Sequence, residues 1–60
     1  MNEQMNKELE QVDTAVSTAI FQVRQAMRHA APLEVLTMEA WLKSLGQISA
    51  DLAYVLTTSK

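Results

Sequence analysis

Cysteine is absent from this 60-residue chain, and glycine, proline, histidine, tryptophan, tyrosine and phenylalanine each occur only once. Without cysteine the chain can form neither a disulfide nor a thiolate metal site, and a single histidine leaves an imidazole metal site without a second ligand. A chain this short buries only about 60% of the surface that it exposes when unfolded. Of the usual remedies for a small core, association with another chain is the one that remains.

Motifs of catalytic and ligand-binding sites are also missing from the sequence: it has no Gly-rich phosphate loop, no zinc-protease motif and no Asp-rich calcium loop. Glu8 and Glu10 are two positions apart, so on a helix their carboxylates point in different directions. His29 follows Arg28 at the expected end of a helix, where an imidazolium complements the helix dipole. We therefore expect no enzymatic activity, no cofactor and no small-molecule substrate.

The charge is mildly acidic, with a formal net charge of −2 at pH 7. This balance disfavours a general nucleic-acid binder, whose affinity comes from many lysines and arginines on phosphates. The first ten residues are polar and do not form a signal peptide. The longest uncharged stretch, residues 14–23, falls short of the roughly 20 apolar residues that span a bilayer. We expect a cytoplasmic protein that does not enter the membrane.

The first half of the chain predicts a long helix, from about residue 2 to about residue 30, because neither glycine nor proline interrupts it. Its apolar residues alternate in steps of four and three, which is typical of the seam of a coiled coil or helical bundle. Ile20 and Met27 widen this stripe on one side. The predicted seam consists of Met5, Leu9, Val12, Val16, Ala19, Val23, Ala26 and Ala30.

Pro32 ends this helix and opens an apolar connection, expected over residues 31–36. The second helix is expected over about residues 37–58, with Thr37 as its N-cap and with Leu36 and Trp41 forming a hydrophobic staple. An alternative start places Pro32 at the first helical position. The seam predicted for this helix is Met38, Trp41, Leu45, Ile48, Leu52 and Val55.

The two seams predict an all-α fold, a single-domain antiparallel two-helix hairpin over residues 1–60, because bulky residues on one helix then lie opposite small ones on the other. A second row on the second helix carries Gly46 and Ala53 and would let another backbone approach closely. Since a hairpin offers that helix only one neighbour, we expect a homodimer in the form of a four-helix bundle. The expected oligomer interface consists of Trp41, Leu42, Gly46, Ser49, Ala53 and Leu56.

Two aromatic residues fall outside the predicted seams. Phe21 lies one turn before Arg24 and two turns before Arg28, and an aromatic side chain beside arginines is typical of a binding hot spot. Tyr54 lies outside the seam of the second helix. We interpret Phe21, Arg24, Arg28 and Tyr54 as candidate partner-binding residues, and the alternative is that Phe21 and Tyr54 are ordinary exposed or packed aromatics.

These features predict a small non-catalytic regulator or adaptor, of the anti-repressor, inhibitor or small-chaperone type, that binds itself, another protein or both. The alternative is an RNA binder. In architecture, over the whole hairpin, the chain resembles the plasmid copy-number Rop family, whose dimers of helical hairpins bind paired RNA loops through helix faces. The resemblance is one of architecture; the residues of this chain available for RNA contacts are Arg24 and Arg28, with Phe21 for stacking on a base.

Overall fold

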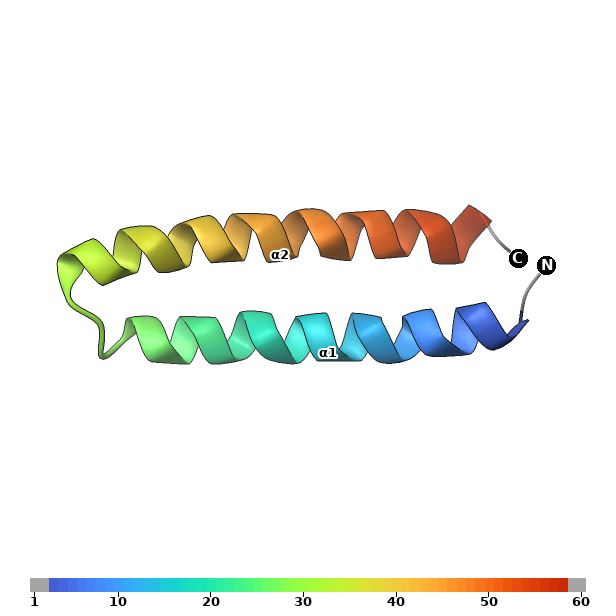
Figure 1. Ribbon diagram of the computed structural model, residues 1–60, viewed down its shortest axis with the longest axis horizontal. Helices are drawn as coiled ribbons and strands as arrows, with labels where there is room; N and C mark the ends of the chain where they lie inside the picture. The colour runs from blue at the N-terminus through green and yellow to red at the C-terminus, as the bar shows by residue number, and fades with distance from the viewer. Residues whose placement is uncertain (1–2, 59–60) are drawn as a thin grey trace.

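A computed structural model describes residues 3–58 and consists, over that range, of two α-helices, α1 (Glu3–Met27) and α2 (Pro32–Thr58). The helices run antiparallel, side by side, and both ends of the described chain lie at the same end of the molecule (Figure 1). The hairpin measures 46 × 15 × 10 Å, so it is one layer of two helices. The predicted all-α hairpin is confirmed; the start predicted at residue 2 lies outside the described residues.

Helix α1 ends at Met27, three residues before the predicted end. The next three amides donate to carbonyls three residues back instead of four: Arg28 to Gln25 at 3.2 Å, His29 to Ala26 at 3.0 Å and Ala30 to Met27 at 3.4 Å. Such bonds tighten the last turn and satisfy carbonyls that have no partner within the helix. The connection is therefore the short turn of residues 28–31.

Helix α2 begins at Pro32, so its predicted start at Thr37, with the apolar connection 31–36 and the staple, is wrong. Proline is favoured at the first helical position because its missing N–H would lack a helical partner there. The Glu34 carboxylate reaches back and accepts a hydrogen bond from the Ala31 N–H at 2.8 Å. This is the acidic half of a capping box, and it stabilises a helix start that has no Ser, Thr or Asp cap.

The helices pack through side chains that repeat in steps of three and four on each of them. The buried residues among those described are Val16, which is 8% exposed, and Leu52, which is 7% exposed. Half-buried residues extend the two contact rows along the hairpin. On α1 they are Asn6, Leu9, Asp13, Ala19, Ile20, Val23 and Met27, and on α2 they are Val35, Met38, Leu42, Leu45, Ser49 and Leu56.

Each contact row differs from its predicted seam by a rotation of the helix. On α1, Met5, Val12 and Ala26 were expected inside but are exposed, and on α2 the same holds for Trp41, Ile48 and Val55. The apolar stripe of each helix is wider than one neighbouring helix can cover. Packing α1 against α2 therefore covers part of each stripe and leaves the remainder in contact with water.

Candidate interaction surfaces

An exposed apolar row lies on each helix, one turn before the contact row. Met5 and Val12 precede Leu9 and Val16 by four residues, and Trp41 and Ile48 precede Leu45 and Leu52 by the same number. Positions four apart are neighbours on a helix surface. We call the exposed large side chains of these rows the apolar face; they are Met5, Val12, Trp41, Ile48 and Val55.

The two rows share one side of the hairpin. On each helix the exposed row is rotated about the helix axis from the contact row by the same angle and in the same direction. Because the two helices are antiparallel and face each other, equal rotations bring both exposed rows to the same side of the hairpin. The antiparallel order also places Met5 near the height of Val55 and Val12 near that of Ile48. Trp41, 51% exposed, lies near the height of the small Ala19. The apolar face therefore runs along most of the hairpin.

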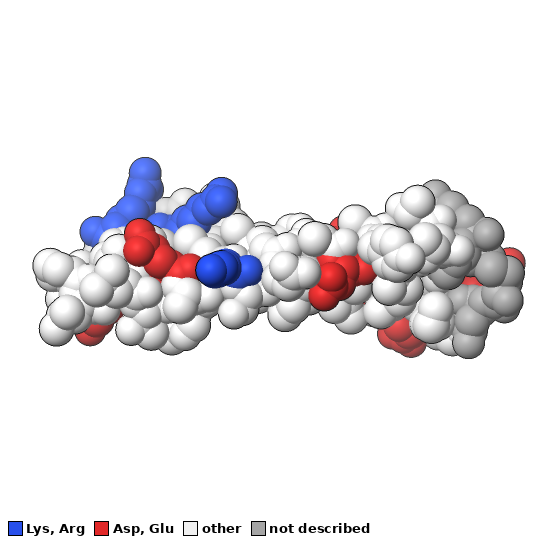
Figure 2. Space-filling model, turned by 90° about the horizontal axis from the view of Figure 1, so that it is seen from above, with Lys and Arg blue, Asp and Glu red and all other residues white. Residues whose placement is uncertain are grey.

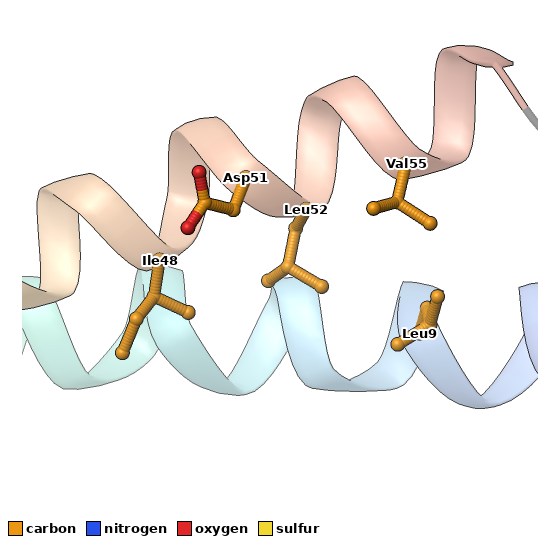
Figure 3. Close-up of a pocket in the computed structure, with 5 residues that line it drawn as sticks. All are labelled: Leu9, Ile48, Asp51, Leu52 and Val55. Carbon is orange, nitrogen blue, oxygen red and sulfur yellow. The ribbon is translucent and has the colours of Figure 1, made fainter.

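An open groove between α1 and α2 follows part of this face. It is lined by Leu9, Ile48, Asp51, Leu52 and Val55. Figure 3 shows the three apolar side chains of α2 pointing towards α1, whereas the Asp51 carboxylate stays beside its own helix. A shallow apolar groove that brings one carboxylate to its edge has no set of converging polar groups with which to orient a small substrate.

The edges of the apolar face are polar, and their charge differs between the two ends of the hairpin. Towards the free ends, Glu8 and Asp51 lie on opposite edges, and each accepts a hydrogen bond from a glutamine on its own helix. Gln4 Nε2 donates to Glu8 Oε2 at 3.0 Å, and Gln47 Nε2 donates to Asp51 Oδ1 at 3.1 Å. Towards the connection the edge positions are the uncharged Gln22, Thr37 and Ser44.

The opposite side of the hairpin is polar or small. Its residues each follow directly after a contact-row residue, so they lie about 100° further around the helix. We call this side the polar face; it consists of Glu10, Ser17, Arg24, Glu39, Gly46 and Ala53, all exposed. A Cβ added at Gly46 would meet nothing within 4 Å, so the hairpin itself does not require a glycine there.

The oligomer interface predicted from the sequence is divided among three locations. Leu42, Ser49 and Leu56 are half-buried in the row that contacts α1. Gly46 and Ala53 lie on the polar face, and Trp41 lies on the apolar face. Met5, Val12, Ile48 and Val55 are the surface residues that sequence reasoning missed, because their seam positions predicted that they face the other helix.

The predicted partner-binding residues of α1 do lie together. Phe21 is 57% exposed, and Arg24 and Arg28 are exposed one and two turns further along. Arg28 Nη1 donates to Gln25 Oε1 at 3.2 Å, whereas Arg24 has no hydrogen-bond partner among residues 3–58. We call Phe21, Arg24 and Arg28 the arginine patch; it combines an exposed ring with two guanidinium groups that no acidic side chain of the described chain neutralises.

Tyr54 stays apart from this patch, whereas His29 directly follows it in the chain. Tyr54 is 70% exposed on the other helix, towards the free ends, so the structure does not bring it to Phe21. His29 is exposed in the turn after α1. Within residues 3–58 no three His, Asp or Glu side chains come close enough to hold a metal ion.

Neither described helix has a stretch apolar enough, over sufficient length, to cross a membrane. Comparison with models of known protein families gives no match to the chain, and comparison with curated proteins and with solved structures gives no significant match either. The function must therefore be inferred from the two faces and the arginine patch alone.

Proposed function

We propose that this chain is a small, non-catalytic regulator or adaptor that acts in the cytoplasm by binding proteins. In this proposal two hairpins pair through their apolar faces into a four-helix bundle, and the paired hairpins bind a further protein through the arginine patch. The observation that carries the proposal is the apolar face. Five large apolar side chains are exposed along one side of a hairpin in which, among described residues, only Val16 and Leu52 are buried.

A second copy of the chain is the occupant that best fits the apolar face. The hairpin is a single layer of helices, whereas stable domains consist of at least two packed layers. A face of a hairpin 46 Å long and 15 Å wide is comparable with the roughly 800 Å² per partner of a standard interface. An identical hairpin presents the same apolar stripe, as a two-fold symmetric dimer requires.

The arginine patch remains accessible in such a dimer. Arg24 belongs to the polar face, and Phe21 and Arg28 lie still further from the apolar face. Arginine and aromatic side chains are enriched among the residues that dominate binding energies. Because these arginines stand out from a chain with a net charge of −2, they favour an acidic surface on the partner protein.

Affinity capture from an extract of the host tests this function. The immobilised chain should retain a protein that survives nuclease treatment, and the variant Phe21→Ala/Arg24→Ala should retain at least tenfold less of it. Lys43→Ala is the matched control, because Lys43 is an exposed cation on the other helix and its loss should leave capture unchanged. Equal capture by the double variant and the wild type would contradict the assignment of the patch.

RNA binding is the second candidate, and the same two arginines motivate it. A dimer would present four such guanidinium groups, as a helical hairpin dimer of the Rop type would need for paired RNA loops. In that case the captured material would disappear on nuclease treatment, and binding would weaken steeply with added salt. A salt-insensitive, nuclease-resistant complex would exclude this candidate.

A further inference from the structure

The two halves of the hairpin, along its length, differ in net charge. Within the described chain, the half near the free ends, residues 3–15 and 46–58, carries five acidic residues and the single cation Lys7. The half near the connection, residues 16–45, carries three cations and two acidic residues. Figure 2 shows the visible Lys and Arg side chains gathered in the half towards the connection. The hairpin is thus strongly acidic at one end and slightly basic at the other.

Two symmetric arrangements are open to a pair of hairpins that meet through their apolar faces. If the two-fold axis runs along the helices, both connections lie at the same end, and α1 of each hairpin faces α2 of the other. If the axis runs across the helices within the plane of the interface, the connections lie at opposite ends. Each helix then faces its own counterpart in the second copy, running antiparallel to it.

We infer that the two hairpins pair with their connections at opposite ends, an inference that rests on the proposed dimer. This arrangement places the acidic half of each hairpin against the slightly basic half of the other. The same-end arrangement places two strongly acidic halves side by side. Because Arg24 and Arg28 lie away from the apolar face, this preference acts through the long-range field of each half, and it disfavours the arrangement that brings the two acidic halves together.

The edges of the apolar face favour the same orientation. Leu9 and Leu52 line one groove, so their neighbours Glu8 and Asp51 lie at similar heights on opposite edges of the face. In the same-end arrangement, Glu8 of the second copy faces Asp51 of the first, and the two-fold axis repeats this contact between like charges. In the opposite-end arrangement Glu8 instead faces the α1 edge of the other copy, which carries Gln22, and Asp51 faces the α2 edge, which carries Thr37 and Ser44. All three are uncharged hydrogen-bond donors.

Distances between spin labels in the dimer distinguish the two arrangements. The chain has no cysteine, so Leu33→Cys provides a single labelling site, on the exposed first turn of α2 beside the connection. If the connections lie at opposite ends of the dimer, the two labels are about 35 to 45 Å apart, given a rise of about 1.5 Å per residue along α2. Connections at the same end bring the labels to within about 25 Å, the diagonal of a bundle with helices about 10 Å apart plus the label arms.

Gln47→Cys is the matched control, because Gln47 lies near the middle of α2 and its labels are about 20 to 30 Å apart in either dimer. A long distance at residue 33 together with the control distance supports the inference. A short distance at residue 33 overturns the orientation and leaves the dimer standing. Loss of the dipolar signal at both sites, with the mass of a single chain in solution, overturns the proposed dimer itself.

Discussion

Both sides of this hairpin are exposed, but they differ chemically. The apolar face presents Trp41, Ile48 and Val55 on α2, whereas the polar face presents Gly46 and Ala53 on the same helix. Removing large apolar side chains from water stabilises an assembly by about 25 cal/mol for each Å² buried, and small side chains supply little such area. This difference is why we propose the apolar face, and not the polar face, as the interface.

The largest expected contrast is in the Kd of the dimer, when one carboxylate is introduced on either side of the hairpin. Ile48→Asp would bury two carboxylates in the symmetric interface and remove two isoleucine side chains, so we expect the dimer to weaken by at least 3 kcal/mol, more than 100-fold in Kd. Ala53→Asp places the same group on the polar face and should change Kd less than threefold. Sedimentation equilibrium measures both; a dimeric Ile48→Asp variant would contradict the assignment of the apolar face.

Part of this fold could be predicted from the sequence alone. Both helices follow from their apolar periodicity and the absence of internal proline, and Pro32 marks the change of direction. The preferred start of α2 at Thr37 was wrong and the alternative start at Pro32 is confirmed: Thr37 offers a capping hydroxyl, whereas Glu34 caps the actual start through a hydrogen bond from the Ala31 N–H. Both sites carry genuine helix-start signals, and only the packing of the chain decides between them.

Rotation of the helices was beyond sequence reasoning for a related reason. The apolar stripe of each helix includes both the contact row and the exposed apolar row, and one neighbour covers only part of such a stripe. The periodicity therefore predicts which residues avoid water but not which neighbour covers them. Ile48 and Leu52 look equivalent in the sequence, yet Leu52 is buried against α1 and Ile48 is exposed. The arginine patch was found because its residues share one helix, where spacing alone predicts proximity.

The two exposed aromatic residues of α2 provide a second, smaller contrast. Trp41 belongs to the apolar face and Tyr54 does not. We expect Trp41→Ala to weaken the dimer by about 2 to 4 kcal/mol, as is typical when a central aromatic is removed from an interface. Tyr54→Ala should leave dimerisation within about 0.5 kcal/mol of the wild type. Equal effects of the two substitutions on the monomer–dimer equilibrium would show that the contribution of an aromatic residue to dimerisation depends on its exposure and not on the face that carries it.

Gly46→Ala gives the smallest effect and the opposite sign. Glycine inside a helix costs about 1 kcal/mol relative to alanine, because its backbone loses more conformational freedom on folding. Since an added Cβ would meet nothing within 4 Å in the hairpin, and the proposed dimer uses the other face, we expect the variant to be more stable by about 0.5 to 1 kcal/mol. Urea unfolding at a fixed chain concentration measures this change.

If the second chain instead packs closely against Gly46, as a row of small residues would permit, the added methyl group separates the helices and the variant is less stable. The sign of this one free-energy change therefore decides which side of α2 the second hairpin covers, independently of any charge introduced elsewhere.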